Sequence, residues 1–280
     1  KIDFLIIEAS SFQLAYSKFV APDYSILLNI SNDHLDWHGS IKNYLNSKFK
    51  IFKLQKKNQF SIVNKKLKKK FDEEKFLGKP IIPNLNNYKK IKRKFKNPYL
   101  KSNINDENMS NVFELSKILK INKRSFVKSL NSFQGLPHRY EIFLKKKNFI
   151  FINDSKATSF QATKFALINT KNIFWIVGGL PKKNDKIIFK EEKKNILKCY
   201  IIGKTINFFK NQINKKIKYH ISRNLKIAIQ KILKDAKLYN TEKKIVLLSP
   251  AAASYDQFLN FEKRGDEFKR LSKMYARKYI

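Results

Sequence analysis

The chain contains little cysteine, and it has no long apolar run. Its one cysteine, Cys199, excludes an internal disulfide and fits a reducing compartment. No apolar stretch approaches the ~20 residues that a membrane-spanning helix needs. The start of the chain is not typical of a cleavable signal peptide, because residues 4–7 predict a buried strand that ends in the acid Glu8. We therefore expect a cytoplasmic protein that does not insert into a membrane.

Acidic residues are also scarce, with 22 Asp and Glu against 60 Lys and Arg and a net charge of +38. Such an excess is typical of proteins that bind nucleic acid or anionic surfaces. Here it is mostly lysine, spread over surface runs such as residues 65–70 and accompanied by much Asn, Ile and Phe. Because basic runs are usually solvated faces, we favour compositional drift. A basic nucleic-acid-binding protein stays as an alternative.

A chain of 280 residues can form one or two domains, and Gly135-Leu136-Pro137 punctuates this one. We predict a first domain over 1–136 and a second over 137–280. In the first, the apolar patterns predict strands at 4–7, 25–30 and 59–63 and helices within 41–54 and 106–130. We expect residues 65–102 to be irregular, apart from one short strand at 81–82.

In the second domain, strand and helix patterns alternate, which indicates a mostly parallel sheet with right-handed crossovers. This predicts an α/β fold of the Rossmann-like type. The expected strands are 149–152, 173–177, 198–202, 216–219 and 245–248, and the expected helices include 160–168, 224–239 and 262–279.

The run Asn153-Asp154-Ser155-Lys156-Ala157-Thr158 places a carboxylate, an ammonium and two hydroxyls between a predicted strand and a predicted helix. Open α/β sheets bind ligands at the carboxyl ends of their strands, and helix N-termini suit phosphate. The alternative is an ordinary helix cap, in which Asp154 or Ser155 satisfies the first turn.

Polar residues follow other predicted strands as well. Glu8 suits Mg²⁺, a cation that prefers oxygen ligands, but taken alone it is better explained as a surface acid at the end of a strand. The loop at 29–38 holds two histidines and two aspartates, which is consistent with metal binding or acid–base chemistry; the alternative is a polar loop whose histidines are hydrogen-bonded. Three further loops are polar or rich in small residues. Residues 135–139 place a guanidinium after a rigid turn, and residues 178–182 contain Gly-Gly and a lysine. Residues 249–258 are rich in small residues. Together they predict an interdomain cleft for phosphate, a divalent metal and a small polar substrate.

Seven blocks of the chain carry a resemblance to a known family: E-A-S-S-F-Q-L (8–14), N-I-S-N-D-H-L-D (29–36), Y-L-N-S-K-F-K-I-F (44–52), G-L-P-H-R (135–139), N-D-S-K-A-T (153–158), G-G-L-P-K (178–182) and S-P-A-A-A-S-Y-D-Q-F-L-N-F-E-K-R-G (249–265). In their order they resemble the Mur ligases of peptidoglycan synthesis. The last block and N-D-S-K-A-T are similar to those of the members that add D-glutamate.

The resemblance implies part of a central ATPase-type α/β domain, followed by a complete Rossmann-like domain that binds the incoming amino acid. It implies an ATP-dependent, ADP-producing ligase. ATP phosphorylates the carboxylate of UDP-N-acetylmuramoyl-L-alanine, and the amine of D-glutamate attacks the resulting acyl phosphate. The protein would act by positioning and by neutralising charge on the γ-phosphoryl group. We expect a monomer.

The resemblance also implies roles for particular residues. The metal ligands would be Glu8, His34 and Lys48, with Lys48 carbamylated and two Mg²⁺ ions bound. Catalytic roles would fall to Lys48, His34 and Lys156. Asn111, Arg139 and Asp154 would bind ATP. The residues around D-glutamate would be Thr158, Lys182, Ser254, Tyr255 and Phe261, while Ser11 and Gln13 would face the muramoyl-alanine arm.

Two features that the resemblance leads us to expect are absent from the sequence: an N-terminal domain that grips UDP and a P-loop. No G-x-x-x-x-G-K-[ST] run occurs. We therefore expect these 280 residues to be inactive on their own. The alternative within enzymes is another amide ligase of the superfamily, such as a folylpolyglutamate synthase or a Mur ligase for a different amino acid.

Overall fold

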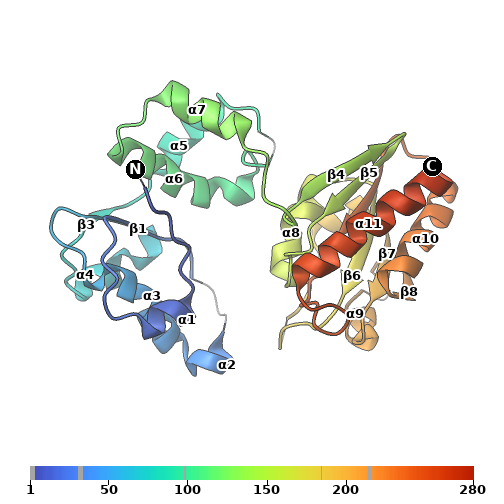
Figure 1. The fold of residues 1–280 in the computed structure, drawn as a ribbon, viewed down its shortest axis with the longest axis horizontal. Coiled ribbons are helices and arrows are strands. Elements are labelled where there is room, and N and C mark those ends of the chain that lie inside the picture. Colours follow the sequence, from blue (N-terminus) through green and yellow to red (C-terminus); the bar gives the residue numbers. More distant parts are fainter. Residues whose placement is uncertain (1–3, 31–33, 98, 184, 214–215) are drawn as a thin grey trace. The chain divides into compact units, whose positions relative to one another are not determined.

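The computed structural model describes residues 4–30, 34–97, 99–183, 185–213 and 216–280. The chain forms two compact units, Lys1–Phe133 and Gln134–Ile280. Figure 1 shows both units.

The first unit contains a small parallel sheet in the order β1-β2-β3, formed by Tyr24–Leu27, Phe60–Val63 and Lys79–Ile81. Two helices, α3 (Ile41–Lys53) and α4 (Lys68–Glu73), contribute three buried phenylalanines to the core over this sheet: Phe49, Phe52 and Phe71. The α3 helix begins after Ser40, whose hydroxyl accepts a hydrogen bond from the Asn43 amide.

A second core of the first unit lies among three further helices, α5 (Leu85–Lys92), α6 (Asp106–Ile118) and α7 (Lys123–Ser132). Aromatic residues fill it, including Tyr88, Phe113 and Phe126. The unit also contains two short helices, α1 (Ser11–Tyr16) and α2 (Leu35–His38). The candidate residues Ser11 and Gln13 lie on α1, and His34 directly precedes α2.

Two predictions for this unit are wrong. Residues 4–7 are not a buried strand: they are irregular, and their side chains are 64 to 93% exposed. A short apolar run forms a strand only beside a partner strand, and among the described residues β1 pairs with β2 alone. Residues 65–102 are also not mainly irregular, because Leu67 and Phe71, and likewise Tyr88 and Ile91, recur at helical spacing among the lysines.

The second unit is built on a six-stranded sheet in the order β4-β5-β9-β6-β7-β8. All neighbouring strands are parallel except β4, which runs antiparallel to β5. The strands are β4 (Glu141–Lys146), β5 (Phe149–Asn153), β6 (Ile173–Gly178), β7 (Ile196–Ile202), β8 (Tyr219–Arg223) and β9 (Lys244–Leu248).

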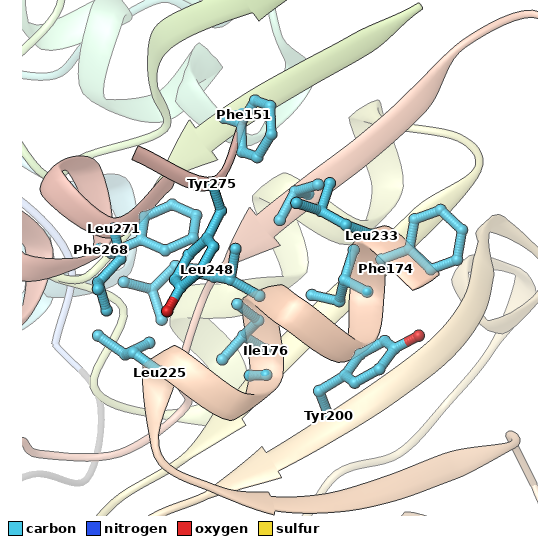
Figure 2. Packing of buried hydrophobic residues seen from close by; sticks show 14 of the residues in the cluster. Phe151, Phe174, Ile176, Tyr200, Leu225, Leu233, Leu248, Phe268, Leu271 and Tyr275 are labelled. Atoms are coloured by element: carbon cyan, nitrogen blue, oxygen red, sulfur yellow. The ribbon is translucent and has the colours of Figure 1, made fainter. Parts of the chain in front are cut away.

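Helices cover both faces of this sheet. On one face, α10 (Leu225–Asp235) and α11 (Phe261–Tyr279) pack over Phe151, Phe174 and Tyr200, as Figure 2 shows. On the other, α8 (Phe160–Asn169) and α9 (Ile206–Ile213) pack over alternate residues of the same strands. The central strands are apolar on both sides because both faces are buried.

The α/β fold class predicted for this unit is confirmed, with two differences in its strands. The strand expected at 216–219 begins only at Tyr219, which pairs with Cys199 at the start of the β7–β8 ladder. The antiparallel β4 was not predicted, because half of its residues are charged and none is fully buried.

Candidate functional site

The strands β5, β6, β7, β8 and β9 are parallel, so their carboxyl ends lie at one edge of the second unit's sheet. The loops after β5, β6 and β9 are hydrogen-bonded to one another there. The Asp154 amide donates to the Leu248 carbonyl at 2.7 Å, and the Gly178 amide donates to the Pro250 carbonyl at 2.9 Å. Leu180 and Ala253 exchange a pair of 2.9 Å backbone hydrogen bonds. The structure thus brings together three of the polar motifs that the sequence singled out.

Asp154 is buried at the centre of this edge. Its carboxylate accepts a hydrogen bond of 2.6 Å from the Ser249 hydroxyl and one of 3.1 Å from the Tyr140 amide. Burial raises the pKa of Asp154 to about 7, although these hydrogen bonds and the charge of Arg139 act in the opposite direction. The group is therefore poised to change charge near neutral pH.

Lys156 and Thr158 follow on the same loop. The Lys156 ammonium lies 3.9 Å from the centroid of the Phe261 ring, a cation–π contact, and the Lys156 amide donates to the His138 carbonyl at 3.0 Å. Thr158 is half-buried and directly precedes Ser159, whose hydroxyl caps α8 by accepting from the Ala162 amide. The cap alternative for Asp154 or Ser155 is therefore wrong, since the capping residue of α8 is Ser159, four or five residues later.

Arg264 of α11 is hydrogen-bonded to the loops after β5 and β9 at this edge. The sequence interpretation did not assign it a role. The guanidinium is 1% exposed and donates to the Ser155 hydroxyl, the Ser155 carbonyl and the Ala252 carbonyl at 2.8 to 3.0 Å. Burial lowers its pKa to about 10. Its position in the helical pattern could have indicated that Arg264 is buried, because it shares the apolar face of an amphipathic helix with Phe268 and Leu271.

His138 and Asn153 form a second buried pair beside Arg139, which is itself partly exposed. The side-chain nitrogen of Asn153 is hydrogen-bonded to Nδ1 of the His138 ring, 2.9 Å away, and Nε2 of the same ring lies 3.8 Å from Asp266. Asn153 also donates to Glu141 at 3.1 Å. These contacts fix the turn that leads into Arg139.

The residues expected around an amino acid differ in exposure. Ser254 is buried and its carbonyl accepts from two amides of the next turn, whereas Tyr255 is 71% exposed. Lys182 is exposed on the loop after Gly178 and Gly179. Both glycines have φ near +130°, and a Cβ on Gly179 would lie 2.2 Å from the Ala253 carbonyl oxygen. Only glycine permits this close approach.

In the first unit, α1, α2 and α3 bring other predicted residues together. The rings of His34 and Tyr44 are 6.4 Å apart, and the Lys48 ammonium lies 5.3 Å from the centroid of the same tyrosine ring. Ser11 is buried, with its hydroxyl 3.0 Å from Nε2 of His38. His38 stacks on Phe12.

Other predicted residues of this unit lie elsewhere or make local contacts. Glu8 is exposed, and Gln13 forms a capping box with Ser10 at the start of α1. Asn111 is 1% exposed on α6, and its side-chain oxygen finds no hydrogen-bond partner within the described part of the chain. The loop residues Ser31, Asn32 and Asp33 lie outside the described residues.

Within the described ranges, no three His, Cys, Asp or Glu side chains are grouped closely enough to hold a metal ion. No helix in the described part of the chain combines the length and the apolar character needed to cross a membrane.

Residues 1–121 match the Mur ligase middle domain. Relatives extend the match over nearly the whole chain. A protein of Rickettsia felis is 33% identical over 294 residues, covering 98% of this chain, and a protein of Wolbachia sp. subsp. Brugia malayi is 35% identical over 89% of it. Both are named UDP-N-acetylmuramoylalanine–D-glutamate ligase. The chain belongs to the Mur ligase family.

The chain spans 66% of the Rickettsia ligase and 53% of the Wolbachia ligase, less than two thirds of either. Solved Mur ligases have the same fold. MurF of Thermotoga maritima, solved with ADP, matches 93% of this chain and 64% of its own with a TM-score of 0.62 at 14% identity. A MurF of Acinetobacter baumannii matches 94% of this chain and 62% of its own with a TM-score of 0.64 at 13% identity. The fold expected from the sequence blocks is confirmed.

Proposed function

We propose that this Mur ligase joins D-glutamate to UDP-N-acetylmuramoyl-L-alanine in an ATP-dependent step of peptidoglycan precursor synthesis. The observation that carries the proposal is the joined edge of the second unit, where the loops of Asp154, Lys182 and Ser254 are hydrogen-bonded to one another. A titrating carboxylate and several cations lie at this edge, and the cations support the proposal that an anionic substrate and a phosphate bind there. The names of the relatives support the identity of the substrates.

The reaction we propose proceeds through an acyl phosphate. The muramoyl-alanine carboxylate takes the γ-phosphoryl group and ADP leaves. The amine of D-glutamate attacks the acyl carbon and loses a proton, the amide forms, and phosphate departs with one oxygen of the original carboxylate. The protein's task is to orient the reactants and to stabilise charge.

For the nucleotide we propose Asn111, Arg139 and Asp154, with Lys156 orienting the same site. The unpaired oxygen of Asn111 supports this assignment, because a buried polar atom without a partner is costly unless a ligand satisfies it. The Lys156 ammonium packs over the Phe261 ring, which restrains its position on the loop that also carries Asp154.

For D-glutamate we propose a different set, with Lys182 as the cation for one carboxylate. Ser11 and Gln13 would face the muramoyl-alanine arm. The amino-acid set is Thr158, Lys182, Ser254, Tyr255 and Phe261.

For Mg²⁺ we propose Glu8, His34 and Lys48. His34 and Lys48 contact the same Tyr44 ring, which supports their acting together. An ammonium cannot ligate a cation, so we propose that Lys48 is carbamylated, which adds a carboxylate-type oxygen donor. The bound metal would neutralise phosphate charge.

The experiment is an assay of ADP release by the protein expressed from the complete gene, with UDP-N-acetylmuramoyl-L-alanine and a panel of amino acids. Stimulation by D-glutamate alone supports the proposal. Stimulation by L-lysine or diaminopimelate instead would assign the protein to a different amide ligase. RNA or DNA affinity that falls steeply with salt, without ligation, would favour the nucleic-acid alternative.

We further propose a cytoplasmic monomer. The single buried Cys199 fits a reducing compartment. Light scattering of the purified protein would test the oligomeric state, and a dimer mass at micromolar concentration would contradict it.

A further inference from the structure

A turn after β7, formed by Gly203, Lys204 and Thr205, contacts two of the loops described above. The Thr205 hydroxyl donates to the carbonyl of Gly179, in the loop after β6. The Lys204 amide donates to the Asp256 carboxylate at 2.8 Å, in the loop after β9. The sequence motifs did not single out this turn, yet it links both loops that carry proposed amino-acid contacts.

At Gly203 the turn is closely packed against both the loop after β6 and the loop after β9. Gly203 has a φ of +86°, and a Cβ there would lie 2.4 Å from a carboxylate oxygen of Asp256 and 2.8 Å from the Gly179 nitrogen. Residues of the loops after β6 and β9 therefore pack closely against Gly203 on two sides. Only glycine allows both contacts at this position.

A neighbouring contact extends the same connection to β8. The carbonyl of Arg223, the last residue of β8, accepts from the Gly203 amide at 2.8 Å and from the Gln257 side chain at 2.9 Å. Asp256 and Gln257 are adjacent, so one short segment of the loop after β9 holds both the turn and the end of β8. Ser254 and Tyr255 directly precede this segment.

Asp256 supplies the side-chain acceptor in this arrangement. Its acceptor atom bonds a backbone amide, so the contact fixes the path of the main chain instead of the rotamer of a flexible side chain. Arg264, the buried cation that holds Ser155 and Ala252, is also close enough for the Asp256 charge to act on it.

We propose that Asp256 is a positioning residue for the amino-acid site: by holding the turn at Lys204 it fixes the loops of Lys182 and of Ser254 and Tyr255 relative to each other. The inference rests on the proposed function, because it assigns those loops to D-glutamate. Asp256 itself touches no substrate in this account.

The test compares Asp256→Ala with Asp256→Asn, since the asparagine oxygen can still accept from the Lys204 amide. The control is Glu242→Ala, which removes an exposed acid before β9, at the amino end of that strand. All variants are made in the protein expressed from the complete gene. The first measurement is amide hydrogen exchange, and the second is the pair of KM values for D-glutamate and MgATP.

For Asp256→Ala we expect about tenfold faster exchange at Lys204, Leu180 and Ala253, and unchanged exchange in the core of β6 and β7. We expect the KM for D-glutamate to rise about tenfold and the KM for MgATP to stay within twofold. Asp256→Asn and Glu242→Ala should match the unmodified protein in both measurements.

The proposal is overturned if Leu180 and Ala253 keep their exchange rates in Asp256→Ala, or if Asp256→Asn behaves as Asp256→Ala does. Equal rises in both KM values, or faster exchange throughout the sheet, would also overturn it, because they indicate a general loss of stability. A protein that does not respond to D-glutamate at all contradicts the proposed function, and the exchange rates still decide whether Asp256 holds the loops.

Discussion

The Ser249 hydroxyl donates a 2.6 Å hydrogen bond to the Asp154 carboxylate, joining loops whose residues are 95 positions apart in the chain. Both residues are buried, and both follow parallel strands that are neighbours in the sheet. The side chain that sits between the loops is therefore an acid with a raised pKa, and the behaviour of the site depends on its charge.

Asp154 should make the stability of the second unit depend on pH. The pKa is about 7 in the folded protein and near 3.9 when unfolded, so the folded state binds an additional proton between these values. The stabilisation from the protonated acid is complete below about pH 4 and is lost as pH rises through 7, by roughly 4 kcal/mol in total. Asp154→Asn, which cannot ionise, should remove this dependence.

Guanidinium unfolding from pH 5 to pH 8 tests this. Trp175 is buried in β6 and donates to the Ser249 carbonyl at 2.7 Å, so its fluorescence reports on the second unit. A Trp37→Phe background leaves Trp175 as the sole tryptophan of these 280 residues. The free energy of unfolding of Asp154→Asn, relative to that of its parent, should increase as the pH rises. A difference that is the same at every pH would contradict the raised pKa of Asp154.

Thr158→Val should weaken the use of D-glutamate more than the binding of ATP. The change keeps the shape of the side chain and removes its hydroxyl, while the cap of α8 depends on Ser159 and stays intact. We expect a loss of about tenfold or more in kcat/KM for D-glutamate, since an unmade hydrogen bond to a charged group costs about 1.5 to 3 kcal/mol. Ser159→Ala is the control for simple loss of helix stability, and an equal loss for both substrates in Thr158→Val would mean that the hydroxyl is structural.

Gly265→Ala should destabilise the second unit although alanine normally favours helices. A Cβ at this position of α11 would lie 2.2 Å from the ring nitrogen Nδ1 of His138 and 2.9 Å from the Asn153 amide nitrogen. We expect a loss of about 1 to 3 kcal/mol, typical of overpacking, which exceeds the gain of 0.5–1 kcal/mol or so in helix propensity.

Ser272→Ala on the same helix is the matched control. Ser272 is fully buried, and its hydroxyl has no hydrogen-bond partner among the residues that the structure describes, so its removal should be neutral or stabilising. Thermal unfolding of both variants compares them directly. A Gly265→Ala protein as stable as its parent would show that His138 can move without cost.

Lys48→Gln should abolish MgATP-dependent turnover, because the glutamine side chain cannot carry a carbamate. Lys42→Gln, at an exposed position of the same helix, should keep full activity. A carbon-13 carbamate signal after incubation with labelled bicarbonate should appear in the parent and in Lys42→Gln, and be absent from Lys48→Gln. The same signal in Lys48→Gln would place the carbamate on another lysine.

The central parts of the fold follow from sequence patterns, because β6, β7 and β9 are apolar runs bounded by glycine, proline or polar residues. Partners that are distant in sequence were harder to predict. Residues 4–7 have the composition of a strand but no partner strand in the described ranges, and the lysines around Phe71 and Tyr88 obscured two short helices.

The candidate site was predictable only in part for a related reason. Polar runs such as 153–158 are visible because the reactive groups are contiguous. Arg264 and Asp256 act on backbone atoms more than 50 positions away, Arg264 on Ser155 and Asp256 on Lys204, so only the folded chain reveals them.

The transfer of an ¹⁸O label tests the central claim most directly. UDP-N-acetylmuramoyl-L-alanine labelled in its carboxylate is incubated with ATP, Mg²⁺, D-glutamate and the protein expressed from the complete gene, and the phosphate is analysed by mass spectrometry. An acyl phosphate predicts one labelled oxygen per phosphate released, only when D-glutamate is present. Unlabelled phosphate, or release that does not depend on D-glutamate, would contradict the account.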